Sequence, residues 1–446
     1  MHFARTAPPA RRTLDRRVKQ VVRWGTSHAL PRTAVALGAR RGDLQGRLVA
    51  QMSNGTSAEL FTLLDEIRGK GPVFLSKLGA VVASHEAVRE TLANPDVEAG
   101  RFVPPDSVLA RIGAWSEIDV LHPVRPPSLL AVEPPQHTRY RKLVTKVFSA
   151  RAVAQLKDRT QQIADELVAA IPAGEPGDLI ASYCALLPVT VICEILGVPP
   201  GERHRVLELG EAAAPSLDLG LPWREFRRVE SALATFDRWL TGHLDRLRAQ
   251  PGDDLLSQLV TAQEDGAGLT DQEVKSTAGL VLAAGFETTV NLLGNGIALL
   301  AADPAQRALL RERPDLWDNA VNEILRYDPP VLLTGRMTVR RTTIAGAGVP
   351  AGRLVSVALA GANRDPDVFP RPHVFDVTRD NARDHLSFGA GRHYCLGASL
   401  ARMEGAIGLR TLFERFPAVE LRPGARRRPT RILRGYGTLP AVARTR

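Results

Sequence analysis

The chain has 446 residues, of which 44% are hydrophobic and 24% charged, and its formal net charge is +10. This length allows up to three domains, but no Ser/Gly linker or repeat divides the chain, so one large domain is equally possible. Three cysteines exclude a disulfide framework; Cys184 and Cys193 lie in an apolar run and are expected to be buried, which favours a reducing, cytoplasmic location. The N-terminus lacks the apolar run of a secretory signal, and polar side chains interrupt the longest apolar stretch, residues 278–302, so we expect no integral membrane segment.

The positive charge is concentrated at the N-terminus. Residues 1–41 contain ten Lys and Arg against one acid, Asp15, so the rest of the chain is nearly neutral. Residues 1–50 show no strong helical or strand period, and we expect a basic, poorly ordered extension there, followed by a folded domain over residues 51–446. Contact with lipid headgroups is an alternative role for the extension. We expect no nucleic-acid partner; the alternative, a nucleic-acid binder using this segment, predicts steeply salt-dependent binding.

Regular periods begin after this extension. A single apolar face predicts a helix over residues 59–67, which a Gly/Pro-rich turn ends. A hairpin over residues 73–83 and a helix over residues 86–92 are expected next. Residues 99–130 are long and irregular, and loops of this length inside compact domains are usually functional or disordered.

A long central helix is predicted over residues 270–302. The sequence Thr-Asp-Gln-Glu at its start is a capping box. Inside the helix, Glu287 is followed by Thr288 and Thr289, residue types that weaken a helix, and a Thr hydroxyl can bond the carbonyl four residues back and bend it. Because the helix keeps residues that weaken it, we infer that their side chains have a function. The alternative is a conventional helix with one solvated face.

A shorter helix is predicted over residues 315–327. It carries Glu323 and Arg326, three residues apart on one face. Ion pairs at this spacing are usually exposed and contribute little to stability. Residues 340–359 then alternate through turns, a pattern that predicts a small β-sheet.

Residues 385–400 have the most unusual composition of the chain. They hold three glycines and Cys395, and a helix is predicted directly afterwards, over residues 400–413. Glycine lets the backbone take positive φ and pass close to a bulky group, and a helix start directs N–H groups at the preceding sulfur. We expect these effects to depress the pKa of the Cys395 thiol and to favour the metal-binding thiolate. The alternative is a buried structural cysteine in a Gly-rich turn.

This segment resembles the haem-binding loop of the cytochrome P450 family, position by position. The matching pattern is Phe388-Gly389-x-Gly391-x-His393-x-Cys395-x-Gly397. The resemblance implies that Cys395 is the axial thiolate ligand of the iron of haem b (iron protoporphyrin IX). It also implies that Phe388 packs beside the sulfur and that Gly389 and Gly397 belong to the cofactor-binding loop. Thiolate ligation pushes electron density onto iron and favours O–O cleavage.

Further segments match the same family. The residues from Glu133 to Arg141 are similar to its Pro-Pro-x-His-x-x-x-Arg segment, which implies that His137 and Arg141 bind the haem propionates. On spacing alone, two polar residues on one helical face would equally suit a solvated face. Arg336 matches a second propionate-binding arginine. His393 is implied as a third contact, with a solvent-facing histidine as the alternative.

Residues 283–289 resemble the oxygen-binding helix of the family. The resemblance implies four catalytic residues. Ala284 and Gly285 would leave room for dioxygen, and Glu287 and Thr288 would be the acid–alcohol pair that delivers protons where bulk water is largely excluded.

The surroundings of Glu323 and Arg326, next to an Arg-Tyr-Asp-Pro-Pro turn, also match the family and imply a buried structural pair that folding requires. Residues 433–440 resemble its last hairpin. The substrate pocket that the resemblance implies is lined by Val331, Leu332, Leu333, Tyr436 and Thr438.

The family also implies a fold and a reaction. The expected fold is predominantly α-helical with small β-sheets (α+β), with haem between the long central helix and the Cys395 loop and with residues 51–446 as the catalytic domain. The expected reaction inserts one atom of O2 into a small apolar organic substrate, by hydroxylation or epoxidation. The sequence has no Gly-rich nucleotide-binding loop, so electrons from NAD(P)H would arrive through a ferredoxin and a ferredoxin reductase.

The ferredoxin would dock on a basic face, because complementary charge steers such encounters. The residues expected on this face are Arg141, Lys142, Lys146, Arg392 and Arg402. The alternative function is a haem-thiolate protein that binds a ligand without turnover.

Overall fold

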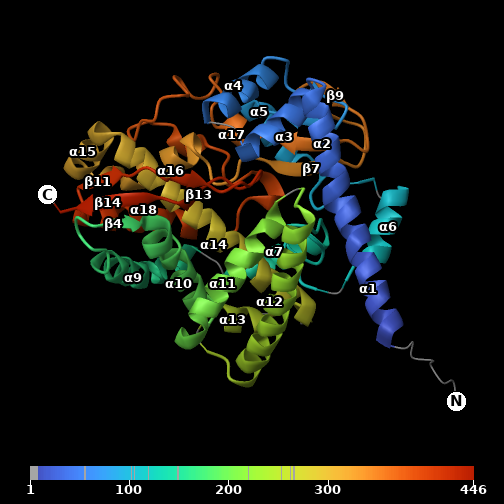
Figure 1. Ribbon diagram of the computed structural model, residues 1–446, viewed down its shortest axis with the longest axis horizontal. Coiled ribbons are helices and arrows are strands. Elements are labelled where there is room, and N and C mark those ends of the chain that lie inside the picture. Colours follow the sequence, from blue (N-terminus) through green and yellow to red (C-terminus); the bar gives the residue numbers. More distant parts are fainter. Residues whose placement is uncertain are drawn as a thin grey trace.

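The computed structural model describes residues 9–54, 57–101, 103–104, 106–118, 120–147, 150–218, 220–252, 254–261, 263–264 and 267–445. Helices make up most of the described chain, and the sheets are small (Figure 1). The predicted fold class is therefore confirmed. Among the described residues, no helix is both long enough and apolar enough to cross a bilayer.

The long helix α14 (Asp271–Ala302) runs through the centre of the molecule (Figure 1). It begins with the predicted capping box, in which Thr270 Oγ1 accepts from Glu273 N–H and Glu273 Oε2 accepts from Thr270 N–H at 2.8 Å. Helices pack around it on several sides: α10 (Leu186–Ile195), α11 (Arg203–Ala213), α12 (Trp223–Ala249), α16 (Trp317–Tyr327) and α18 (Ala398–Arg415). The main hydrophobic core lies between these helices.

The largest sheet has five strands in the order β1-β2-β10-β7-β3. Its strands are β1 (Phe74–Leu75), β2 (Ala80–Val82), β10 (Leu354–Val357), β7 (Thr334–Thr338) and β3 (Val97–Glu98). The predicted hairpin is confirmed by the antiparallel β1–β2 pair, and β10 runs parallel to β2 with Val355 opposite Ala80. The β-rich stretch predicted after residue 340 is also present, since β8 (Thr342–Ile344) pairs with β9 (Ala347–Val349).

The C-terminal strands form two further small sheets beside α14. One has the order β11-β14-β4, and the other is the pair β12–β13. Their bounds are β11 (Ala418–Leu421), β14 (Pro440–Arg444), β4 (Pro176–Asp178), β12 (Arg426–Arg427) and β13 (Tyr436–Thr438), and a last pair is β5 (Gln263–Glu264) with β6 (Ala267–Gly268). The strand β13 lies inside the hairpin predicted over residues 433–440, but its antiparallel partner β12 precedes that range.

The remaining elements are helical. The other α-helices outside the N-terminal segment are α4 (Ser57–Arg68), α5 (His85–Ala93), α6 (Val108–Ser116), α7 (Gln136–Val147), α8 (Ala150–Gln155), α9 (Lys157–Ala169), α13 (Leu255–Thr261), α15 (Pro304–Glu312) and α17 (Leu359–Ala362). Short 3-10 or π segments are η2 (Ile180–Cys184), η3 (Pro200–Glu202), η4 (Ala214–Leu217), η5 (Pro314–Leu316), η6 (Ala382–Asp384) and η7 (Gly391–His393). Among the described residues of the stretch predicted to be irregular, only α6 is helical, and Ser107 caps it by accepting from Ala110 N–H at 3.1 Å.

The N-terminal segment differs from its prediction. Residues that we expected to be poorly ordered form α1 (Pro9–Trp24), η1 (Gly25–Ala29), α2 (Leu30–Arg40) and α3 (Leu44–Asn54). Arg23 Nη2 lies 2.5 Å from Glu230 Oε1 of α12, and Trp24 Nε1 donates to the Leu221 carbonyl at 3.0 Å. Figure 1 shows α1 running along the edge of the molecule beside α6. These partners lie about 200 residues away in sequence, so local periodicity could not reveal them.

Candidate functional site

The Cys395 loop depends on its glycines. Gly389 and Gly391 have φ of +69° and +66°, the left-handed region that L side chains rarely adopt. A Cβ on Gly391 would also lie 2.5 Å from the Leu92 carbonyl oxygen. The loop closes when Cys395 N–H donates to the Phe388 carbonyl at 2.9 Å, and α18 begins at Ala398. The predicted combination of Gly-rich turn, cysteine and helix start is therefore present.

The predicted depression of the Cys395 pKa is not found for the free thiol. The side chain is exposed, yet protein atoms surround it on most sides, and this burial raises the pKa of the thiol. The Gly397 N–H and the cations Arg141 and Arg402 act in the opposite direction, but they do not outweigh burial. The Gly397 N–H at the helix start does favour the thiolate, as predicted, but its effect on the pKa is smaller than that of burial.

His137 is a buried polar residue with an unused nitrogen. It is 3% exposed, and its Nε2 has no hydrogen-bond partner among the described residues. Burial, followed by the charges of the nearby His393 and Arg141, lowers the pKa of His137 to about 4. Arg141 interacts electrostatically with Cys395, so the structure brings the predicted propionate residues and the predicted iron ligand into one cluster.

Glu133 is a member of this cluster that sequence reasoning did not assign. Its Oε2 accepts from Arg392 Nε at 2.6 Å, its Oε1 lies 3.1 Å from His393 Nε2, and it also accepts from Ala99 N–H at 2.6 Å. Burial alone would raise the pKa of Glu133, but these hydrogen bonds and cations lower it to about 2. Arg392 was predicted to dock a partner and His393 to bind a propionate. In this structure both side chains contact the Glu133 carboxylate instead. Glu133 directly precedes the Pro-Pro-x-His segment, and this position is the sequence signal that could have identified it as a member of the site.

Arg336 completes the basic side of the cluster. It is 6% exposed, and burial lowers the pKa of its guanidinium to about 10. Its Nη1 donates to the Gly335 carbonyl at 2.8 Å and to Thr334 Oγ1 at 3.0 Å; its other nitrogens make no hydrogen bond to the described chain. Among the described residues of this cluster, arginine and histidine groups thus outnumber the single acid, Glu133. An anionic group that accepts from His137 Nε2, such as a haem propionate, fits this set of donors.

The middle of α14 carries the four predicted catalytic residues. Thr288 Oγ1 donates to the Ala284 carbonyl at 2.7 Å and Thr289 Oγ1 to the Gly285 carbonyl at 3.0 Å, so the predicted bonding to carbonyls four residues back is confirmed. Glu287 is buried, and burial raises the pKa of its carboxyl.

Glu287 has a partner that sequence reasoning missed. Arg428 Nη1 lies 2.9 Å from its Oε1 and lowers the pKa that burial has raised. No sequence signal was available, because Arg428 lies 141 residues further along the chain.

The pair Glu323–Arg326 is buried, as predicted. Both side chains are 0% exposed, with Arg326 Nε 2.6 Å from Glu323 Oε2. Arg379, which the sequence reading missed, adds a second cation at 3.2 Å. Arg326 also donates to the carbonyls of Asn363, Pro372 and Val374. The cluster therefore fixes the irregular segment that precedes the Cys395 loop.

The predicted pocket residues lie in several different packing environments. Leu332 and Leu333 are buried in a core cluster with residues of α3 and α4. Val331 forms an isolated bridge with Leu433 of the C-terminal segment. Tyr436 packs against the main core and Thr438 Oγ1 donates to the Gly424 carbonyl at 3.2 Å. Their contact with substrate stays a prediction.

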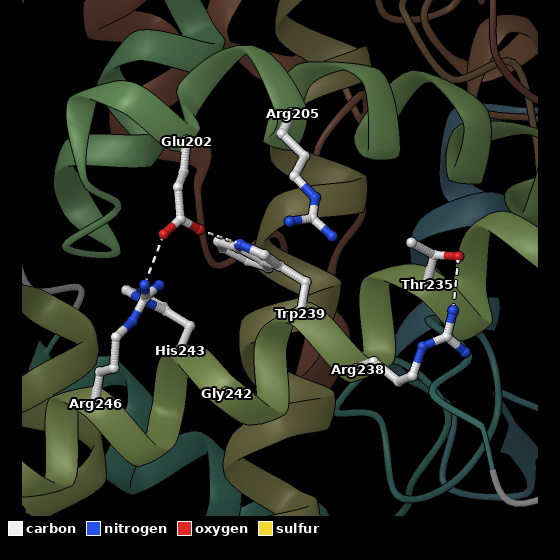
Figure 2. A pocket seen from close by; sticks show the side chains of 8 residues that line it. All are labelled: Glu202, Arg205, Thr235, Arg238, Trp239, Gly242, His243 and Arg246. Carbon is white, nitrogen blue, oxygen red and sulfur yellow. Dashed lines mark hydrogen bonds and ion pairs between the residues drawn. The ribbon is translucent and has the colours of Figure 1, made fainter.

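A pocket of about 360 Å³ between η3–α11 and α12 contains none of the predicted site residues (Figure 2). Its carboxylate, Glu202, lies 2.6 Å from Arg246 Nη1 and accepts from Trp239 Nε1 at 2.5 Å. These two hydrogen bonds lower the pKa of Glu202. The acid of this pocket is thus satisfied by its neighbours, which distinguishes it from the His137 cluster.

Known proteins share both the fold and the motifs. The family model described as cytochrome P450 matches residues 214–440. A Mycobacterium tuberculosis protein with the provisional name cytochrome P450 140 is 49% identical over 433 residues, 95% of this chain and 98% of that protein. Cytochrome P450 monooxygenase PikC of Streptomyces venezuelae is 43% identical over 320 residues, covering 70% of this chain and 75% of PikC.

A solved structure gives the same result. Ligand-free CYP164A2 of Mycobacterium smegmatis has a TM-score of 0.79 and 33% identity, over 89% of this chain and 99% of that chain. The fold, the Cys395 loop and these relatives define a haem-thiolate monooxygenase. The chain belongs to the cytochrome P450 family, whose members hold haem through a cysteine thiolate and generally depend on a redox partner.

Proposed function

We propose that this protein inserts one atom of O2 into a small apolar organic substrate, by hydroxylation or epoxidation. Electrons from NAD(P)H reach it through a ferredoxin and a ferredoxin reductase. The cofactor is haem b, which supplies the iron at which O2 is reduced, with Cys395 as axial ligand. The observation that carries this proposal is the clustering of the Cys395 thiol with buried basic groups, one of which, His137, has an unused nitrogen.

The basic residues of the cluster bind the cofactor. His137 and Arg141 lie one helical turn apart on α7, and Arg336 approaches from β7. Buried basic groups with unused donors bind carboxylates strongly, because an unpaired buried charge is costly. His393 becomes a further propionate contact when a propionate replaces Glu133 as its hydrogen-bond partner.

Glu287 and Thr288 move protons. Reduction of O2 consumes two protons, and α14 is too deeply buried for bulk water to deliver them freely. Glu287 holds its position through Arg428 and can take up a proton, because burial raises its pKa. The Thr288 hydroxyl donates to Ala284 and keeps lone pairs for a water or an oxygen of the reacting group.

The electron partner docks on the exposed side of the Cys395 region. Lys142 is exposed and Arg402 is half-buried, with its Nε donating to Asn322. The side chain of Lys146 lies outside the described residues. A cytoplasmic location fits the buried thiols Cys184 and Cys193, because free cysteines persist in a reducing compartment.

The direct test is turnover under ¹⁸O2 with a surrogate ferredoxin, its reductase and NADPH, over a panel of apolar compounds. We expect products that carry one labelled oxygen, and a loss of about 10²–10⁴-fold in product formation for Glu287→Gln, the range of general acid–base catalysis. Glu420→Gln, an exposed acid on β11, is the matched control and should not change the rate. Substrate-dependent spectral changes without labelled product would instead support a ligand-binding protein without turnover.

A further inference from the structure

A partly open cavity of about 380 Å³ lies where the N-terminal helices meet the rest of the molecule. Its walls come from the α1–η1 junction, residues 117–118 and 120–126, residue 216 with residues 221–233 in and before α12, and the first turn of α14. The ion pair Arg23–Glu230 holds α1 in this position. The basic N-terminal segment therefore forms one wall of a cavity.

The cavity lining carries more basic than acidic groups. Arg23 and Arg125 line it with two histidines, and its only acids among the described residues are Glu117 and Glu230. Both oxygens of Glu230 are already used, because Oε1 accepts from Arg23 Nε at 2.6 Å and Oε2 from Gln20 Nε2 at 2.8 Å. Glu117 is exposed. The two guanidiniums and two carboxylates of the lining balance in number, but among the described residues only Arg23 and Glu230 form an ion pair with each other.

Arg125 is the guanidinium of the lining that has no such ion pair. Within the described ranges, no hydrogen bond or ion pair reaches its half-buried side chain. Burial, followed by the charge of Arg23, lowers the pKa of this guanidinium, although Glu117 and Glu230 act in the opposite direction. A desolvated cation is costly until an anion pairs with it, and the guanidinium fork matches a carboxylate with two parallel hydrogen bonds. Arg125 is therefore built to receive an anionic group from outside the chain.

His28 adds a second polar group to the lining. Its Nδ1 accepts from Leu221 N–H at 3.3 Å, so the neutral ring carries its proton on Nε2 and can donate there. Burial, followed by the charge of Arg125, lowers the pKa of His28 to about 4. A neutral donor beside a cation suits an anionic oxygen.

The rest of the lining is apolar. Phe226, Val229 and Leu233 recur on one face of α12, and Leu221 precedes them. This face would cover a hydrocarbon chain or ring. The cavity volume lies in the range of small-molecule sites, about 300–1,000 Å³.

We propose that this cavity binds an amphipathic carboxylate, with the carboxylate on Arg125 and the hydrocarbon body on the apolar face of α12. This goes beyond the proposed monooxygenase function, which places no charge on the ligand. It also requires no haem chemistry, so it can be tested separately.

The test is isothermal titration calorimetry of the purified full-length protein with decanoate and with its uncharged match, decan-1-ol. We expect decanoate to bind the wild type at least tenfold more tightly than decan-1-ol. Arg125→Gln should remove that difference, and Arg125→Lys should keep part of it, because lysine retains the charge but loses the fork. Arg205→Gln, at an exposed arginine of the Figure 2 pocket, is the matched control and should bind as wild type.

Two results would overturn the proposal. One is equal affinity of the wild type for decanoate and decan-1-ol. The other is decanoate binding by Arg125→Gln that matches the wild type, when both have the same thermal unfolding midpoint. Because heat of binding is measured rather than turnover, a failure here would leave the monooxygenase assignment untouched, and the reverse also holds.

Discussion

Arg428 contacts both carboxylate oxygens of Glu287, with its Nη1 2.9 Å from Oε1 and 3.0 Å from Oε2. Glu287 lies in the middle of α14, and Arg428 follows β12 near the C-terminus. Burial raises the pKa of Glu287 and Arg428 lowers it. The contact ties the C-terminal strands to the part of α14 that carries the predicted proton-delivering residues.

Replacing Arg428 should therefore destabilise the fold. For Arg428→Gln we expect a loss of about 1–3 kcal/mol in the free energy of unfolding, because a buried carboxylate is left without its cation. Adding Glu287→Gln should recover most of that loss, since no buried charge remains. Urea unfolding measures both, with Arg426→Gln at an exposed arginine of β12 as the control. Equal effects of the Arg428 and Arg426 substitutions would contradict this account.

The fully buried pair Glu323–Arg326 should contribute more to the free energy of unfolding than an exposed ion pair. Arg326→Ala leaves Glu323, at 0% exposure, with Arg379 as its remaining cation at 3.2 Å. We expect a loss of about 3–5 kcal/mol, because the bidentate partner of a fully buried carboxylate is removed, and such a loss is enough to abolish folding in many proteins. Arg410→Ala breaks the pair with Glu414, in which both side chains are about half exposed, and should change stability by about 0–1 kcal/mol. Yield of folded protein and urea unfolding compare the two; similar losses would show that the buried pair is not structural.

The raised pKa of Glu404 should make the free energy of unfolding depend on pH. Burial raises the pKa of this carboxyl on α18 to about 8, although a hydrogen bond with Thr289 lowers it. The unfolded chain releases the proton near pH 4.5, whereas the folded chain keeps it until about pH 8. The unfolded state thus binds fewer protons in this window, so stability falls as pH rises, by about 1.4 kcal/mol per pH unit for this group.

Glu404→Gln removes that dependence. Its stability relative to the wild type should increase between about pH 5 and about pH 8, and the increase should end above the folded pKa. Urea unfolding at several pH values measures the difference. A difference that is constant with pH would mean that Glu404 ionises in the folded protein as it does in the unfolded chain.

His137 should slow the dissociation of haem from the protein. His137→Leu removes a buried nitrogen that has no described partner, so the substitution should leave the stability of the haem-free chain unchanged or raise it by about 1–3 kcal/mol. Haem should dissociate faster, because one propionate contact is lost. Transfer of haem to an excess of an acceptor protein measures the rate, with His373→Leu, an exposed histidine, as the control. An unchanged rate would remove His137 from the propionate site.

Much of the fold could be predicted from the sequence, because the patterns that begin, end and orient these elements involve residues close together in the chain. The capping box at Thr270 and the apolar period of α4 each lie within a few residues, and both elements were found where the pattern placed them. The Cys395 loop was equally recognisable, since its glycines are required by positive φ and by the contact with Leu92.

The parts that sequence reasoning missed depend on distant partners. The N-terminal helices are held by Glu230 and Leu221, and the polar partners of Glu287 and His393 are Arg428 and Glu133. Charge-pair partners carry no periodicity, so spacing cannot identify them. The pKa of Cys395 was misjudged for the same reason, because burial depends on the packing of the whole chain.

The ferrous–CO difference spectrum of the purified protein tests the central claim most directly, that Cys395 holds haem iron as a thiolate. We expect a Soret band shifted far to the red in the wild type and in Cys193→Ala, which removes a buried cysteine outside the site. Cys395→Ala should lose that band. A globin-like band in the wild type, or a red-shifted band that survives Cys395→Ala, would show that Cys395 is not the ligand, and the haem-thiolate account of this chain would then be wrong.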